Sequence, residues 1–218
     1  MSREKILAAL RSALAETPLS VDAPPARPES LPVGSDWPDA WARLAEALAP
    51  LEVRLRLAKT PAEAARHVAD IARERQAATY ARWGQELDAL GLDEALAHLT
   101  RVGPDCCQSL AQVDLGLTSA HAALLESGSL ALVAGPDRPR SASLLPPTHV
   151  CLIPRAALTP DVSALSELLL RHCDAAGQLP SCLNLVSGPS STADIELVLV
   201  RGVHGPAAVE AVGLDWDE

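Results

Sequence analysis

The chain has 218 residues, a length that favours one domain with a sizeable core over two full domains. Its 28 acidic and 18 basic side chains give a formal net charge of −10, which repels phosphate backbones and anionic headgroups and so argues against nucleic acid or a membrane surface as partner. It has no run of about 18 uncharged apolar residues and its N-terminal pattern is charged, so we expect a cytoplasmic protein without a spanning helix or signal peptide.

The cysteines show no metal-site spacing. There are 5, an odd number, without a C-x-x-C pair or a nearby pair of histidines. The adjacent Cys106 and Cys107 either ligate a metal, sense oxidants or are plain reduced thiols, and the last reading suits a reducing compartment. We therefore expect no metal bound by this chain.

The N-terminal segment is predicted to be an appendage. Residues 2–16 place Ile6, Leu7, Leu10 and Leu14 on one face of a short amphipathic helix. Residues 17–38 hold 6 prolines and little periodicity, which indicates an extended or partly disordered linker. We divide the chain into a helix and linker over residues 1–36 and an α/β domain over residues 37–218, with the helix packed on its own domain or docked on a partner or second subunit.

From Trp37 onward the pattern alternates between helices and strands. A helix is predicted from Trp41 to its stop at Pro50, followed by strictly alternating residues 51–57, which are typical of a half-exposed strand. Thr60-Pro61-Ala62-Glu63 combines an N-cap, a proline at the first helical position and a capping-box glutamate. A short strand over residues 77–83 and a short helix over residues 93–99 complete this half.

The second half contains three short apolar runs, over residues 128–134, 149–153 and 182–186, that are typical of strands covered on both faces. Between the last two, Thr159-Pro160-Asp161 predicts a capped helix. Strands that alternate with helices predict an α/β layer fold with a largely parallel sheet.

The loop SGPSSTADIE, residues 187–196, is the first candidate site, because ligands in such folds usually lie beyond the carboxyl ends of the strands. Gly188 permits close backbone approach, and a helix predicted to begin near Thr192 would add free N–H groups, so the loop suits a phosphate or carboxylate. The hydroxyl groups would come from Ser187, Ser190, Ser191 and Thr192. Equally, Ser191 to Asp194 reads as a capping box that needs no ligand.

Three other positions carry chemistry. Glu126, in the sequence E-S-G-S, is a base or nucleophile or merely ends a helix through His121 and Leu125. His204, between turn formers, either titrates or binds a metal, or hydrogen-bonds a backbone carbonyl. Arg138 and Arg140 lie in a loop where they contact a carboxylate or phosphate, or belong to a solvated turn.

These pieces, in this order, resemble the LUD domain family. The likeness is strong from about Asp114 to Val209 and extends more weakly back to Trp37. It implies a three-layer α/β/α fold similar to those of ribose-phosphate isomerases, CoA transferases and formyltetrahydrofolate cyclo-ligases. It also implies a part in oxidising L-lactate to pyruvate, with an Fe–S oxidoreductase subunit and a larger ferredoxin-like LUD subunit as partners. Glu126, Asp194 and His204 fall on its motifs and are the candidate catalytic residues.

One position departs from the family pattern, because relatives commonly have Lys or Arg where this chain has Ser191. Anion binding would then depend on loop N–H groups. The chain also lacks the C-x-x-C-x-x-C runs that hold Fe–S clusters, so we expect no cofactor here and place the redox centres in the partners.

An accessory subunit is the leading hypothesis. The alternatives are a stand-alone isomerase, CoA transferase or cyclo-ligase acting on a phosphorylated or CoA-linked molecule, and a scaffold module; a homodimer is a further expectation.

Overall fold

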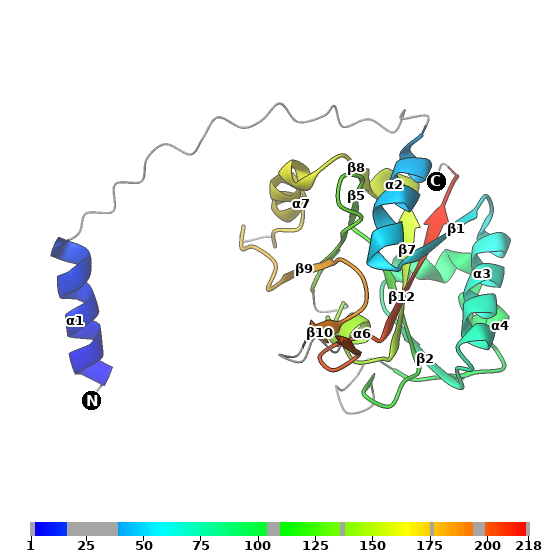
Figure 1. Cartoon of the computed structure of the whole chain (residues 1–218), viewed down its shortest axis with the longest axis horizontal. Coiled ribbons are helices and arrows are strands. Elements are labelled where there is room, and N and C mark those ends of the chain that lie inside the picture. The colour runs from blue at the N-terminus through cyan, green and yellow to red at the C-terminus, as the bar shows by residue number, and fades with distance from the viewer. Residues whose placement is uncertain are drawn as a thin grey trace. The chain divides into compact units, whose positions relative to one another are not determined.

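The computed structural model describes residues 3–16, 39–103, 110–135, 138–174, 177–193 and 199–216. The chain separates into two units, Met1–Ser30 and Leu31–Glu218, and each is treated by itself. The first contains the helix α1, Arg3–Glu16, where a helix is predicted (Figure 1). The predicted linker, residues 17–38, lies outside the described residues.

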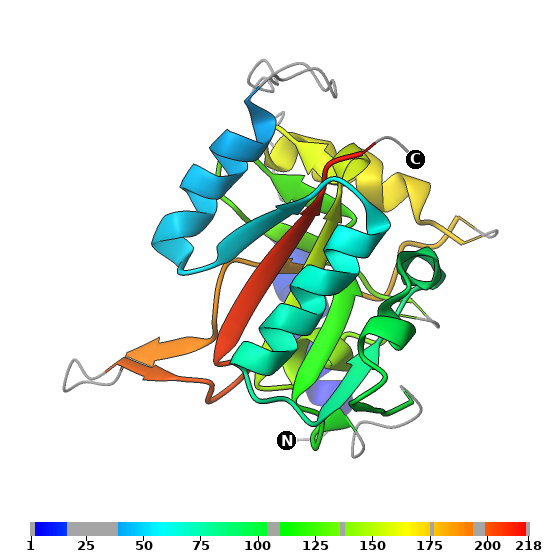
Figure 2. The ribbon, with the colours of Figure 1, turned by 90° about the vertical axis from the view of Figure 1, so that its right-hand side faces the viewer.

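The second unit is built on a six-stranded sheet in which every pairing is parallel (Figure 2). The strand order is β1-β12-β7-β4-β2-β3. The strands are β1 Arg54–Ala58, β2 Thr79–Arg82, β3 Thr100–Arg101, β4 Leu115–Ser119, β7 Thr148–Pro154 and β12 Ala208–Leu214. The predicted α/β class with a largely parallel sheet is confirmed.

The central strand β7 shows why the sheet is buried on both sides. Val150 and Leu152 pack into the core on one face, and Cys151 and Ile153 pack into the core on the other. Successive side chains of a strand point to opposite faces, so a continuous apolar run such as this one suits a strand in a middle layer.

One face of the sheet is covered by α3, Pro61–Glu74, by the 3-10 helix η2, Gln85–Leu90, and by α4, Leu92–Ala95. The start of α3 is as predicted: the Glu63 N–H donates to Thr60 Oγ1 at 3.2 Å, and Glu63 Oε2 accepts from the Lys59 N–H at 2.8 Å. A buried stripe that includes Val68 and Ile71 then fixes α3 on the sheet.

The other face is covered by two helices and by a second sheet. The helices are α2 Ala40–Leu48, with the 3-10 turn η1 Ala49–Leu51, and α6 Ser141–Leu144. The second sheet has the order β8-β5-β6-β9, with β5 Ala122–Leu124, β6 Leu130–Val133, β8 Leu158–Thr159 and β9 Leu183–Val186. The outer face of this sheet packs against α7, Leu165–Arg171, which follows the short 3-10 segments η3 Arg155–Ala157 and η4 Val162–Ala164.

Three local predictions are wrong, each because distant strands compete with a local signal. Residues 122–124 form a strand between β6 and β8, so the option of a helix through His121 fails. Residues 128–134 contain the buried strand β6, as predicted, whereas residues 182–186 form β9 at the edge of the second sheet, so the expected covering on both faces is wrong there and Leu185 is 46% exposed. The helix cap is Asp161, which accepts from the Ser163 N–H at 2.7 Å, since Thr159 ends β8.

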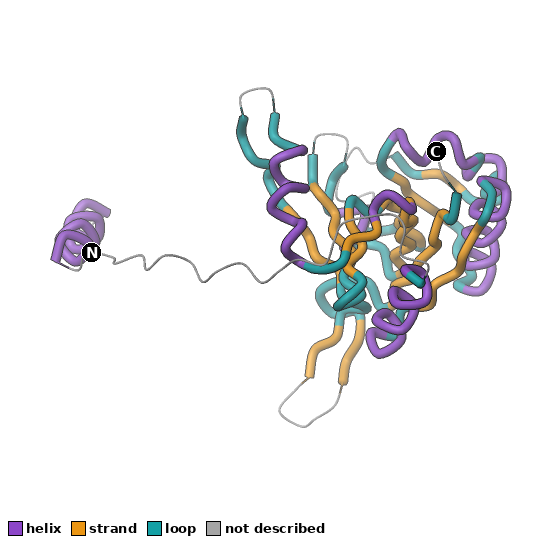
Figure 3. Tube along the Cα trace, turned by 90° about the horizontal axis from the view of Figure 1, so that it is seen from above, coloured by secondary structure: helices purple, strands orange, loops and turns teal. Residues whose placement is uncertain are grey.

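The last element is an antiparallel hairpin, β10 Ser191–Ala193 with β11 Leu199–Arg201. It projects from the rest of the second unit in Figures 2 and 3. Its base is held to η1 by an ion pair between Arg201 and Glu52.

Candidate functional site

The three candidate motifs of the second half meet in one place. Ser127 Oγ donates to Ser129 Oγ at 3.0 Å, and Ser129 Oγ lies 2.8 Å from Ser187 Oγ. The Ser190 N–H donates to the Pro206 carbonyl at 2.8 Å, which joins residues 187–190 to the G-V-H-G-P turn. We call Ser127, Ser129, Ser187 and Ser190 the serine junction.

Two glycines seat this junction against η1 and the end of α2. Gly128 has φ +71°, and a Cβ there would lie 2.8 Å from the Ala47 carbonyl oxygen. Gly188 has φ +101°, and its Cβ would lie 2.6 Å from the Leu51 carbonyl oxygen. The close approach predicted at Gly188 is therefore made to the chain's own backbone, a contact that only glycine allows.

The junction lies on the amino-terminal side of the parallel sheet, and the prediction that it follows a parallel strand is wrong. Residues 187–190 follow β9, a strand of the second sheet, and they contact Leu51 and Pro206, which precede β1 and β12. The predicted helix near Thr192 is also wrong, because β10 pairs with β11 there and Ser191 lies opposite Arg201. Asp194 lies outside the described residues.

Exposed residues at the junction include Ser127 and Ser187 themselves, together with Glu126, Ser191, Thr192 and His204. The hydroxyls of Ser127, Ser129 and Ser187 bond to one another and, within the described ranges, to no histidine or carboxylate. A serine nucleophile needs an adjacent base. The described part of the junction therefore offers neutral donors and acceptors for binding, without an activated nucleophile.

Arg138 and Arg140 lie away from the serine junction. In the β6–β9 ladder, Leu130 pairs with Val186 beside the serines, and Val133 pairs with Leu183 at the other end. The arginines follow Val133, so the length of β6, about 10 Å, separates the two groups. The structure thus divides the predicted ligand-binding residues between two places.

A histidine pair near Arg138 escaped the sequence reasoning. The rings of His121 and His172 meet edge to face, with centroids 4.9 Å apart, and His121 Nδ1 accepts from the Val133 N–H at 3.2 Å. Burial, and after it the positive charges of Arg138 and His172, lower the pKa of His121 to about 4. His121 follows the carboxyl end of β4, and its assignment to a helix hid this position.

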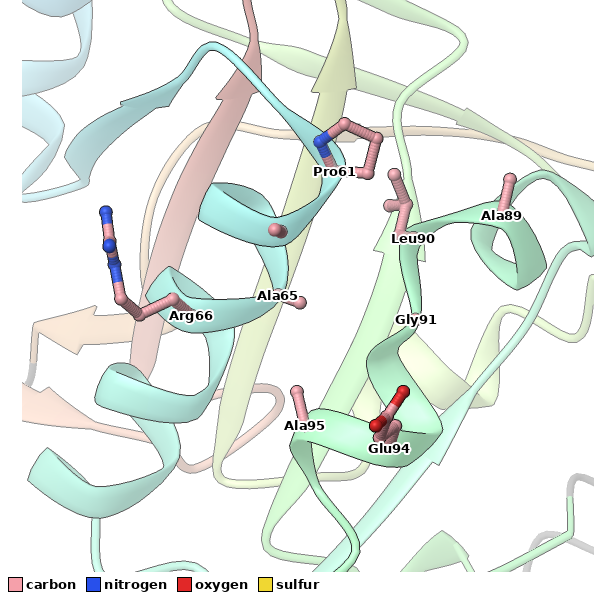
Figure 4. Close-up of a pocket in the computed structure, with 9 residues that line it drawn as sticks. Pro61, Ala65, Arg66, Ala89, Leu90, Gly91, Glu94 and Ala95 are labelled. Carbon is pink, nitrogen blue, oxygen red and sulfur yellow. The ribbon is translucent and has the colours of Figure 1, made fainter.

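A groove of about 500 Å³ lies between α3 and the η2–α4 segment, on the far face of the parallel sheet (Figure 4). Pro61 and Ala65 face Leu90 and Ala95 across it, while Arg66 extends away from it. Its walls are mainly alanine, glycine and proline. Such walls present few groups that could orient a ligand.

Within the described ranges, no group of three or more His, Cys, Asp or Glu side chains is arranged to hold a metal ion. Cys151 is buried and Cys173 and Cys182 are partly buried, whereas Cys106 and Cys107 lie outside those ranges. Among the helices that the structure describes, none is long and apolar enough to cross a bilayer.

Comparison with known proteins gives a consistent picture. The model of the LUD domain matches residues 41–212. Lactate utilization protein C of Halalkalibacterium halodurans is 45% identical over 95 residues, 44% of this chain and 41% of that protein. The same-named protein of Bacillus subtilis is 36% identical over 104 residues, 48% and 43% of the two chains. YkgG of Escherichia coli is 38% identical over 135 residues, 59% and 58% of the two chains. The chain thus spans about half the length of the curated relatives it matches.

A solved structure shows the same fold. A crystal structure of a DUF162 family protein from Deinococcus radiodurans superposes with a TM-score of 0.59 at 20% identity, covering 84% of this chain and 99% of that one. At this identity the likeness concerns the fold alone.

Proposed function

The chain belongs to the LUD domain family, and from that premise we propose that it is an accessory subunit of an L-lactate-oxidising system. It is a LUD protein similar to lactate utilization protein C. In the proposed system lactate loses two electrons and two protons to become pyruvate, and an Fe–S oxidoreductase subunit takes the electrons. A larger ferredoxin-like LUD subunit is the second partner.

The serine junction is the observation that supports an accessory role. The hydroxyls of Ser127, Ser129 and Ser187 bond to one another, and no described base activates them. Beside it, Glu126, His204 and the β10–β11 hairpin are exposed. A surface of this kind is suited to holding a partner or a small anion.

The proposal is tested by L-lactate-dependent dye reduction in anaerobic extracts of a strain that lacks this chain. We expect activity to be absent and to return when the purified chain is added. Glu126→Gln and His204→Gln should restore it poorly, at least about threefold less well at equal concentration, since a loss of about 0.7 kcal/mol at one interface has that effect. Glu74→Gln, an exposed carboxylate on α3, is the matched control and should restore activity fully.

Equal lactate oxidation with and without the chain would refute the accessory role. The competing function, a stand-alone isomerase, CoA transferase or cyclo-ligase, would then be tested by thermal shift with CoA, ATP and sugar phosphates. A true ligand at about 100 times its dissociation constant stabilises the folded state by about 2.7 kcal/mol.

A further inference from the structure

A second cavity, of about 450 Å³, lies beside α6 and the loop that follows β6. It is separate from both the serine junction and the groove of Figure 4. Its walls combine guanidinium groups with apolar side chains. They include Ala134, Arg138, Pro139, Arg140, Leu144 and Leu145.

The backbone that carries the two arginines is fixed. Gly135 and Arg138 exchange backbone hydrogen bonds of 3.3 and 3.1 Å. The carbonyl of Arg140 accepts from Ser143 Oγ at 2.9 Å, and this ties Arg140 to α6. A binding group on a fixed backbone loses little entropy when a ligand arrives.

Two arginines line the cavity in a chain whose formal charge is −10. No acid is among its described lining residues. Arg138 has one carboxylate nearby, Glu86 at 3.5 Å. No described carboxylate pairs with Arg140, and its Nη1 lies 3.9 Å from Cys182 Sγ. Arg140 therefore keeps donors available for an incoming anion.

The remaining walls are apolar. Leu145 is 41% exposed although it is large and hydrophobic, and Leu144 and Pro139 lie beside it. Apolar surface next to unpaired donors is the pattern of a small-molecule site.

We propose that this cavity binds an organic anion, with its carboxylate or phosphate on Arg138 and Arg140 and its apolar body against Pro139, Leu144 and Leu145. The cavity volume exceeds the roughly 200 Å³ that a six-atom hydroxy acid needs at about 30 Å³ per heavy atom. The cavity therefore has room for an anion larger than lactate. This inference does not depend on the role in lactate oxidation.

The test uses anilinonaphthalene sulfonate, a fluorescent aromatic sulfonate, on the full-length protein. We expect saturable binding of one molecule per chain. Arg140→Gln should weaken it about tenfold, the effect of one lost charge-assisted hydrogen bond of about 1.4 kcal/mol. Phenylnaphthylamine, which has the apolar body without the sulfonate, should bind wild type and Arg140→Gln alike.

Arg66→Gln is the matched control, because Arg66 borders the other groove and its side chain is 64% exposed. It should leave sulfonate binding unchanged. The proposal is overturned if Arg140→Gln binds the sulfonate as wild type does, or if Arg66→Gln loses binding. Urea unfolding of Arg140→Gln shows whether the variant is folded, and Leu145→Asn gives a second, charge-independent probe that should also weaken binding. Neither measurement uses lactate, so failure here leaves the accessory role standing.

Discussion

His149 lies on β7 as a fully buried residue beside two other polar groups. Its Nε2 is 2.8 Å from Thr118 Oγ1, and the same hydroxyl is 3.7 Å from Cys151 Sγ. Burial lowers the pKa of His149 to about 4 and raises the pKa of the Cys151 thiol to about 12. Both side chains are therefore neutral near pH 7, and the cluster is a polar part of the core.

The lowered pKa of His149 predicts how the free energy of unfolding depends on pH. In the unfolded chain a histidine has a pKa of about 6.5, so between that value and about 4 the unfolded state binds a proton that folded His149 refuses. This contribution to stability is complete above about pH 6.5 and declines as the pH falls toward 4, by at most about 1.4 kcal/mol per pH unit. Folded His121 resists protonation in the same range, so urea unfolding between pH 7.5 and 4.5 should show the combined slope of the two histidines, and His149→Met should remove the part that His149 contributes.

His204→Gln is the control for that series, because His204 is exposed and should leave the slope unchanged. If His149→Met keeps the full wild-type slope, His149 is not the group that resists protonation. Because the comparison uses the slope of the free energy of unfolding against pH, a general loss of stability in the variant does not affect it.

The sequence pattern identifies exposed functional side chains more readily than buried ones. Glu126 and His204 stand next to turn-forming residues, and this pattern indicates them as candidate site residues. His121 and His149 sit among apolar residues, where the pattern indicates only a strand or helix. What makes them unusual is burial, a property that depends on the tertiary structure.

At the scale of elements, the helices and strands that are predicted correctly are those whose signal lies in their own local sequence. The cap and proline at Thr60 and Pro61 define the start of α3, and the apolar run of β7 is long enough to identify a central strand. Predictions failed where pairing with a distant strand, and not the local sequence, determines the backbone conformation. Residues 191–193 carry capping residues that suit a helix start, yet their backbone groups pair with residues 199–201.

A substitution at Gly188 tests how closely the loop between β9 and β10 packs against η1. Gly188→Ala must strain a backbone at φ +101° and place its Cβ 2.6 Å from the Leu51 carbonyl oxygen. Gly91→Ala is the matched control, since Gly91 also has a positive φ, +64°, and nothing within 4 Å of a Cβ. We expect a loss of about 1 kcal/mol at Gly91 and about 3 kcal/mol at Gly188 in urea unfolding. Equal losses would mean that the loop shifts freely away from η1.

At the scale of the whole molecule, the order of the strands and the presence of a second sheet lay beyond the sequence pattern. Local periodicity identifies β6 and β9 as extended segments at best, and only their antiparallel pairing assigns them to a separate sheet. The family match covers residues 41–212, which lie in this unit and do not include α1. The role of α1 has to be argued from its own surface.

On α1, Ile6 is 45% and Leu7 38% exposed, and both lie in a helix with charged residues elsewhere. In the proposed lactate-oxidising system we expect this apolar pair to dock on a partner. Ile6→Ala with Leu7→Ala keeps good helix formers, so the urea midpoint should not change. In the add-back assay, however, half-maximal activity should need at least about tenfold more protein, because burial of a large aliphatic side chain contributes about 1.5 to 3 kcal/mol. Val162→Ala with Leu179→Ala, two exposed residues outside α1, is the control and should titrate as wild type. An unchanged titration for the α1 variant would mean that the partners recognise the α/β unit alone.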